Sequence, residues 1–298
     1  MISSHAYRYV KGYAMVLAAT LIWSGNFIVA RILHDSISPV TIVVLRSAIA
    51  IFVLAPFVTR SLYFEAHLIR KHVAYLAVTA FLGMTMCNTL VYVAAASSKA
   101  VNLTLIAICS PIFTIIFARI FLKDSLTVNR IASLMIASSG VVYLVTNGNL
   151  SSLGNLSFNP GDIWMLGQAS SFALYSILVQ KRPLELSPLP FLFSLFVLGM
   201  LFLLPWFGWE LLTTDMIELS PSTFWAIIYL GVGPSVLAYM SWNKSVALIG
   251  PSRASFVYYC LPLFSGIEAL FLLDEHITTS HVISGALILT GVILSTRD

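Results

Sequence analysis

Long apolar runs separated by short polar segments extend along the whole sequence. Each has about 20 residues, the length that a helix needs to cross the hydrocarbon core of a bilayer. Such continuous runs predict helices, whereas lipid-facing strands would alternate polar and apolar positions. The predicted spans are residues 12–33, 39–58, 73–94, 99–122, 128–146, 162–180, 188–208, 223–243, 250–273 and 280–296. The expected fold class is therefore all-α, a polytopic membrane protein with ten transmembrane helices.

The two halves of the sequence match each other. At an offset of 151, Pro111 aligns with Pro262 and Gly140 with Gly291, and at an offset of 149 Trp23 aligns with Phe172. Residues 1–146 and 161–298 are thus predicted to be two five-helix repeats, joined by a periplasmic linker at 147–160. Because five is odd, the second repeat enters the membrane inverted, an arrangement typical of transporters. The alternative is an old duplication kept only for packing.

Positive charge predicts the orientation. One side of the predicted bundle holds 12 of the 16 Lys and Arg residues, and the loops at 147–160, 209–222 and 274–279 carry none. Lys and Arg collect in cytoplasmic loops. Both termini are therefore expected in the cytoplasm.

Composition excludes several classes of protein. Hydrophobic residues make up 59% of the chain and charged residues 9%, against about a quarter charged in a soluble domain. A soluble domain, a disordered chain and a nucleic-acid binder do not fit, and the net charge of +4 is explained by the cytoplasmic loops. The three cysteines lie in apolar runs and predict neither a disulfide framework nor a metal site. The expected partners are a small-molecule substrate and membrane lipids.

Several short segments carry a family resemblance. Trp23 is followed by Asn26 and Phe27, span two contains Val-Leu-Arg-Ser-Ala at 44–48, and Pro111 and Pro262 each start a Pro-x-Phe segment. With the ten spans and two inverted repeats, the layout resembles the drug/metabolite transporter superfamily, EamA type. In overall character it is most similar to the YddG-type aromatic amino-acid exporters of bacterial inner membranes. The resemblance implies a multi-pass transporter of that membrane.

Pro111 and Pro262 occupy matching positions in spans four and nine. Each removes a helix hydrogen bond to the carbonyl four residues back, at Ala107 or Tyr258. Paired interruptions of this kind indicate a transporter's binding site and its gating bends. The alternative is that both prolines only kink packed helices.

Charged residues within the predicted spans are few, and three of them, Arg46, Lys99 and Glu268, are candidates for a role in function. Arg46 is a candidate for holding a substrate carboxylate, and Glu268 is a candidate for pairing with Lys99 or Arg46, or for carrying a coupling proton. The alternative is a structural ion pair near the membrane surface.

Polar aromatic and amide side chains near the middle of the spans predict the lining of a cavity, since tyrosine and tryptophan offer an apolar face and a polar tip. The set contains Trp23, Asn26, Asn88, Tyr92, Gln168, Tyr175, Tyr239, Tyr258 and Tyr259, and with Arg46 it forms the candidate substrate site. Four further tryptophans at span ends, Trp206, Trp209, Trp225 and Trp242, are predicted to anchor the protein at the membrane surface.

Catalytic and cofactor motifs are missing from the sequence, so neither an enzyme nor a cofactor is expected. Asp274, Glu275, His276 and His281 could suggest a metal, but the repeat aligns this loop with the ordinary turn at Lys123. The expected function is export of small metabolites, amino acids including aromatic ones, by alternating access at a central cavity. The alternatives are a broad exporter of drug-like molecules and an intramembrane lipid-processing enzyme.

Overall fold

The computed structural model describes residues 4–33, 37–97, 103, 106–107, 109–155, 159–213, 220–272 and 279–296. Within these residues the chain is almost entirely helical and contains no strand. In the first half the elements are α1 (Ser4–Leu33), α2 (Pro39–Lys71), α3 (Val73–Ala80), η1 (Phe81–Met86), α4 (Cys87–Ser97), α6 (Cys109–Leu122) and α7 (Val128–Val145). After the short η2 (Leu150–Asn155) come α8 (Pro160–Gln180), α9 (Pro188–Thr213), α10 (Pro221–Leu230), η3 (Gly231–Leu237), α11 (Ala238–Ile249), α12 (Pro251–Tyr258), α13 (Leu261–Leu272) and α14 (Thr279–Ser295).

Over the residues that the structure describes, the predicted apolar spans are helical except for single residues at span ends and a break at Tyr259 and Cys260 in span nine, which confirms the all-α membrane fold. Among these described residues, five helical segments are long and apolar enough to cross a bilayer: Pro39–Lys71, Val73–Ala95, Val128–Val145, Pro188–Thr213 and Pro221–Ile249. Several helices start at proline, whose fixed φ and missing N–H suit the first helical position. At α8, Asn159 and Asp162 form a capping box as well.

Two helices contain a π-helical segment at matching places in the repeats. The segment η1 joins α3 to α4, and η3 joins α10 to α11; they begin at Phe81 and Gly231, 150 positions apart. A π-turn widens the helix and changes which carbonyls find a donor within it, and such turns are frequent at functional sites. Spans three and eight therefore carry equivalent irregularities.

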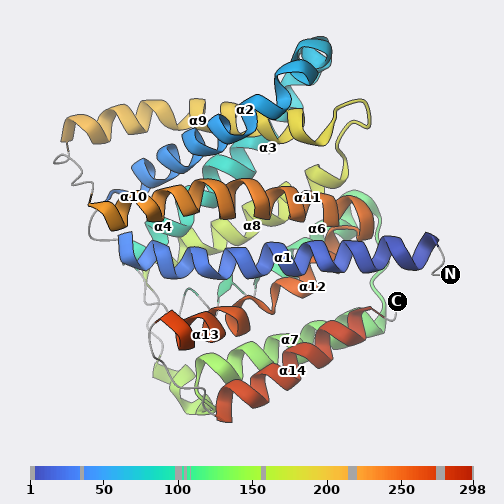
Figure 1. Ribbon diagram of the computed structural model, residues 1–298. Coiled ribbons are helices and arrows are strands. Elements are labelled where there is room, and N and C mark those ends of the chain that lie inside the picture. The colour runs from blue at the N-terminus through green and yellow to red at the C-terminus, as the bar shows by residue number, and fades with distance from the viewer. Residues whose placement is uncertain are drawn as a thin grey trace.

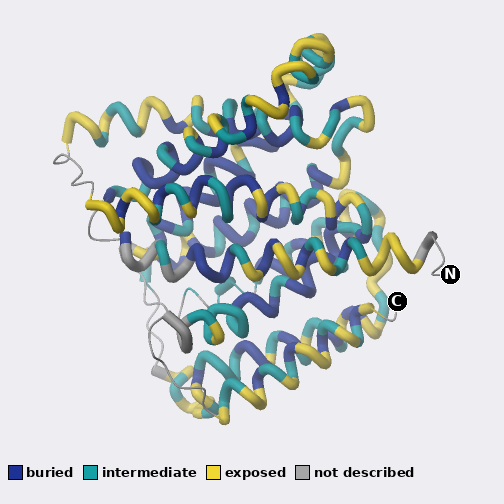
Figure 2. The backbone as a smooth tube through the Cα atoms, in the orientation of Figure 1, coloured by how far each residue is buried: buried dark blue, intermediate teal, exposed yellow. Residues whose placement is uncertain are grey.

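The helices form a bundle with α1 near its centre (Figure 1). On one side of α1 lie α10 and α11, followed by α2 and α9, and on its other side lie α12 and α13, followed by α7 and α14. Close approach of α7 and α14 uses glycine: a Cβ on Gly291 would lie 2.8 Å from the backbone nitrogen of Ala137. Buried residues concentrate in the interior of the bundle and exposed ones toward its outer faces (Figure 2).

Spans four and nine are the ones in which proline was expected to act. Span nine is interrupted at Tyr259 and Cys260, between α12 and α13, and Pro262 is the second residue of α13. Pro111 is the third residue of α6. Pro262 thus stands in the first turn of a helix, where the missing N–H costs least. Ahead of Pro111, the described residues 106 and 107 are also helical.

Candidate functional site

Five aromatic rings from four helices meet in the middle of the bundle and form the central aromatic cluster. The indole of Trp23 on α1 lies 5.5 Å from the ring of Phe172 on α8 and 5.4 Å from that of Tyr239 on α11. Trp242 and Tyr258 complete the cluster, with centroids 5.5 Å and 6.3 Å from Trp23. Edge-to-face pairs of this kind add about 0.5–1.5 kcal/mol beyond the apolar area that they bury. Trp23 and Phe172 are also repeat counterparts, so the two halves meet here ring to ring.

The π-helical segments hold this cluster in position. The Trp23 indole N–H donates to the carbonyl of Pro234 in η3 at 3.1 Å. In the same way, the Tyr239 hydroxyl donates to the carbonyl of Gly83 in η1 at 2.8 Å. The Asn88 side-chain amide donates to the same Gly83 carbonyl at 3.2 Å. Each π-segment therefore supplies a backbone carbonyl to a side chain of the centre.

Arg46 on α2 is buried beside the aromatic cluster, with 3% of the residue exposed. Its Nε donates to Ser235 Oγ at 2.8 Å, and its Nη1 donates to Asn26 Oδ1 and to the Tyr92 hydroxyl, each at 3.3 Å. All three partners are neutral, and among the described residues no carboxylate forms an ion pair with Arg46. A buried charge is costly unless it is paired and hydrogen-bonded. An anionic group that bound beside this guanidinium would therefore be stabilised by it.

A small cavity of about 40 Å³ lies between Arg46 and the aromatic rings. Its lining consists of Trp23, Asn26, Arg46, Cys87, Asn88, Val91, Gln168, Phe172, Tyr239 and Tyr258. The cavity has room for a few waters, whereas ligand pockets usually measure roughly 300–1,000 Å³. The helices around it must separate before an organic solute of amino-acid size can bind.

Seven of the ten predicted site residues line this cavity, and Tyr92 touches it through Arg46. Tyr175 lies behind the cluster, where its hydroxyl donates to Asn243 Oδ1 at 2.7 Å. Tyr259 lies elsewhere, with its hydroxyl 3.0 Å from Ser138 Oγ on α7. A one-residue step along the end of α12 turns the side chain by about 100°, which explains why Tyr258 faces the cavity and Tyr259 does not.

The prediction for Trp242 was wrong. It is fully buried in the aromatic cluster, and its indole N–H donates to Ser176 Oγ at 3.2 Å. Hydropathy placed the end of span eight at residue 243, but α11 continues to Ile249, so Trp242 lies well inside the helix. Trp206, Trp209 and Trp225 are exposed, as expected of membrane-surface anchors.

The prediction of the site missed Phe172, Cys87 and Val91, which line the cavity, and Ser235, which accepts a hydrogen bond from Arg46. Phe172 is apolar, but as the repeat counterpart of Trp23 it could have been found from the alignment of the halves. Ser235 is visible only in the structure, since it positions Arg46 from within η3 and donates to the carbonyl of Leu230 at 2.8 Å.

Glu268 on α13 packs against α1 and does not line the cavity. Its Oε1 accepts a hydrogen bond from Ser24 at 2.8 Å, while its Oε2 is buried without a hydrogen-bond partner. No ion pair joins it to Arg46 in the described structure. Lys99, the other proposed partner, lies outside the described residues, as do Asp274, Glu275 and His276.

Comparison with known proteins agrees with this architecture. The chain is 26% identical over 96% of its length to the uncharacterized transporter YyaM of Bacillus subtilis, covering 93% of that protein. It is 25% identical over 97% of its length to the uncharacterized inner membrane transporter YicL of Salmonella typhimurium, covering 96% of it. A solved crystal structure superimposes with a TM-score of 0.77 at 16% identity, covering 98% of this chain and 97% of the other.

The family comparison covers nearly the whole chain. The model of the EamA-like transporter family matches residues 10–146 and again 159–297. Each match spans one of the two halves that carry the equivalent π-helical segments. The protein is therefore a membrane transporter that belongs to the EamA-like transporter family.

Proposed function

We propose that the protein exports small zwitterionic amino acids, including aromatic ones, across the bacterial inner membrane. The observation that carries this proposal is Arg46, a buried guanidinium that lines the central cavity and is held only by neutral groups. A carboxylate that enters the cavity can form hydrogen bonds in which donor and acceptor are both charged, and a guanidinium can bind it through two parallel N–H groups. Arg46 thus defines the carboxylate end of the site.

The aromatic cluster supplies the other end of the site. The rings of Trp23, Phe172, Tyr239 and Tyr258 border the same cavity as Arg46. They can stack on an aromatic side chain, while the side-chain oxygens of Asn88 and Gln168 are acceptors for an ammonium group. Carboxylate, ammonium and apolar side chain each meet a suitable surface. Among the side chains that the structure describes, no carboxylate or second cation lines the cavity for an extra substrate charge.

Transport requires opening of the cavity, which in its observed form is too small for an amino acid. In the inverted five-helix repeats at 1–146 and 161–298, rocking of one repeat against the other opens a central site alternately to each side. The interruption between α12 and α13, directly after Tyr258, provides a joint at which span nine can bend beside the site. We propose that Pro262, in the first turn of α13, maintains this joint, and that its counterpart Pro111 provides a bend in span four.

Counterflow of radiolabelled solutes into proteoliposomes tests the substrate class. Tryptophan and phenylalanine are expected to move faster than glutamate or lysine, whose additional charge has no counter-charge in the cavity. Trp23→Ala and Tyr258→Ala are expected to reduce transport of phenylalanine more than that of threonine, which lacks a ring to stack. Equal rates for glutamate and phenylalanine would contradict the proposal. Movement of apolar organic solutes without any amino acid would support a broad exporter of drug-like molecules instead.

A further inference from the structure

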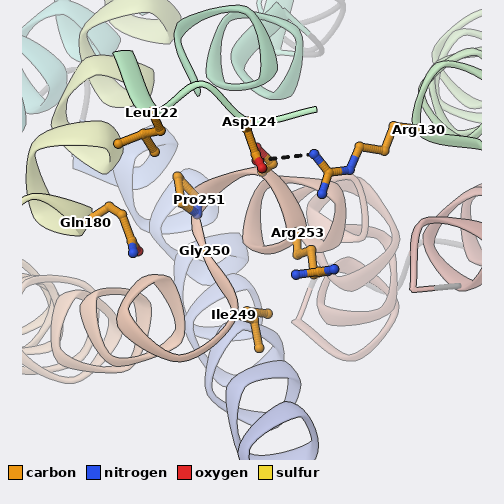
Figure 3. A pocket seen from close by; sticks show the side chains of 9 residues that line it. Leu122, Asp124, Arg130, Gln180, Ile249, Gly250, Pro251 and Arg253 are labelled. Carbon is orange, nitrogen blue, oxygen red and sulfur yellow. Dashed lines mark hydrogen bonds and ion pairs between the residues drawn. The ribbon is translucent and has the colours of Figure 1, made fainter. Parts of the chain in front are cut away.

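A second cavity, of about 300 Å³, lies at the end of the bundle proposed to face the cytoplasm. It is formed by the end of α6, the α6–α7 loop, the end of α8 and the junction of α11 with α12, and we call it the cytoplasmic cavity. Its lining is Leu122, Asp124, Arg130, Gln180, Ile249, Gly250, Pro251, Ser252 and Arg253 (Figure 3). Its volume suits an amino acid, unlike that of the central cavity.

The charges of this cavity are of both signs. Asp124 Oδ2 lies 3.2 Å from Arg130 Nη1 and accepts a hydrogen bond from Ser252 Oγ at 2.7 Å. Arg253 enters from α12, on the same side of the cavity as this pair (Figure 3). Among the described residues, the lining thus contains two guanidiniums and one carboxylate, and it lies beside the N-terminus of α12, which is itself favourable to anions.

The charged side chains of the cytoplasmic cavity differ in how far they are exposed to solvent. The side chain of Arg130 is 7% exposed and is also fixed by a hydrogen bond to the carbonyl of Ser125 at 2.7 Å. The side chain of Asp124 remains 37% exposed, and Gln180 at the rim is exposed. An incoming solute thus meets a rigid cation, a reachable carboxylate and the apolar side chains of Leu122 and Ile249.

The cytoplasmic cavity is connected to the central site by α12. This helix runs from Pro251 in the cytoplasmic cavity to Tyr258 in the aromatic cluster, a path of about 10 Å at the helical rise per residue. The cavities do not share a lining residue, and the fully buried indole of Trp242 packs on Phe172 and Tyr258 at the central end. A solute can occupy the outer cavity while the central one is closed.

We propose that the cytoplasmic cavity is a first binding subsite for the exported amino acid. The α-carboxylate binds at Arg253 and Arg130, the α-ammonium binds at Asp124, and the side chain rests on Leu122 and Ile249. This inference rests on the proposed function, since it assigns the same zwitterionic substrate to a second site on its path. It differs from a purely structural role, in which Asp124, Arg130 and Ser252 only fasten the α6–α7 loop to α12.

Protection of an introduced thiol tests the subsite directly. Gln180→Cys places a thiol at the exposed rim, and Lys181→Cys places a matched thiol on the next residue, which is exposed but does not line the cavity. Both are made in the full chain with Cys109→Ala, because the other native cysteines, Cys87 and Cys260, are buried. In purified protein, L-phenylalanine is expected to slow N-ethylmaleimide modification at 180 and not at 181, and phenylalaninamide, which lacks the carboxylate, is expected not to protect.

Variants separate the subsite from the central site. Arg253→Gln and Asp124→Asn each remove a charged hydrogen-bonding partner and should raise the half-protecting concentration about tenfold. Arg46→Gln should leave protection unchanged, because Arg46 belongs to the central cavity alone. Arg253→Gln keeps the Asp124–Arg130 ion pair. It therefore still tests the role of the charged residues in binding if Asp124→Asn fails to fold.

Three outcomes would overturn the subsite: no protection at 180, equal protection at 181, or loss of protection in Arg46→Gln, which would mean a conformational signal from the central site. Unchanged protection in Arg253→Gln and Asp124→Asn would also overturn it. The charged residues of the cavity would then have only a structural role, holding the α6–α7 loop against α12. If any of these outcomes is observed while phenylalanine counterflow is intact, the subsite is rejected and the proposed function is retained. Protection without counterflow would instead contradict the proposed function and support the subsite.

Discussion

At the scale of single residues, the two repeats differ in the charge that they carry at equivalent positions. Arg46 aligns with Leu195, which is fully buried in the apolar core on α9. Arg46 lines the central cavity and Leu195 does not, so the cation of the site comes from the first repeat alone. With the proposed substrate, a single cation beside aromatic rings would favour one orientation of the bound molecule.

Gly83 shows how tightly the centre is packed. A Cβ at this position would lie 2.1 Å from the ring of Tyr175, whose hydroxyl is held by Asn243. Gly83→Ala is therefore expected to destabilise the protein by about 1–3 kcal/mol, because the ring cannot move aside without breaking that bond. Thermal unfolding in detergent measures the effect. Gly208→Ala is the control, since nothing lies within 4 Å of a Cβ there, and equal melting temperatures for the two variants would contradict the account.

At the scale of elements, much of the helical architecture could be predicted, because an apolar run in lipid has few conformations that satisfy its backbone. The helix ends could not be predicted, because the apolar run ends at the membrane surface whereas the helix continues beyond it. The α2 helix extends to Lys71, beyond the expected residue 58, because no glycine or proline follows Pro56 within it. The same effect at α11 caused the wrong placement of Trp242.

The site was less predictable than the helices. Arg46, Trp23 and Tyr258 were found because a charge or a polar aromatic group inside a span is unusual. Ser235 and the carbonyls of Gly83 and Pro234 were not found, because their roles depend on π-helical turns. For η1 no comparable local signal stands in the sequence, whereas η3 contains Gly231, Gly233 and Pro234, which could have indicated an irregular turn.

Pro262→Ala tests the joint in span nine. Restoring an N–H near the break between α12 and α13 should favour a continuous helix and slow phenylalanine transport several-fold, at near-normal expression. Pro205→Ala is the matched control, because Pro205 lies inside α9 and does not line either cavity. Initial rates of counterflow in proteoliposomes measure the effect. If Pro262→Ala transports as the parent does, the interruption serves packing only.

At the scale of the whole molecule, the two cavities lie at opposite ends of α12. The larger one lies at the positively charged end of the bundle, and the smaller one lies at the meeting point of the repeats. We propose that a solute passes through them in series and that the aromatic cluster closes the path between them. This polarity depends on the orientation proposed from the distribution of Lys and Arg.

Reporter fusions test that orientation. A reporter active only in the cytoplasm should be active when fused at Asp298 and silent when inserted in the 147–160 linker, because the positive loops predict cytoplasmic termini. A reporter active only in the periplasm should give the reverse pattern. Activity of the cytoplasmic reporter at both positions would contradict the inverted arrangement. Activity in the linker alone would reverse the orientation and place the larger cavity on the periplasmic side.

The most direct test of the central claim, that Arg46 holds the substrate carboxylate, is a two-by-two measurement of binding. Phenylalanine and phenylalaninamide are titrated against the parent protein and against Arg46→Gln, with Arg60→Gln, an exposed arginine on the same helix, as the control. The account predicts that Arg46→Gln weakens binding of phenylalanine about tenfold and leaves that of phenylalaninamide nearly unchanged, since the amide has no carboxylate to lose. Equal loss for both ligands, or equal loss in Arg60→Gln, would contradict it.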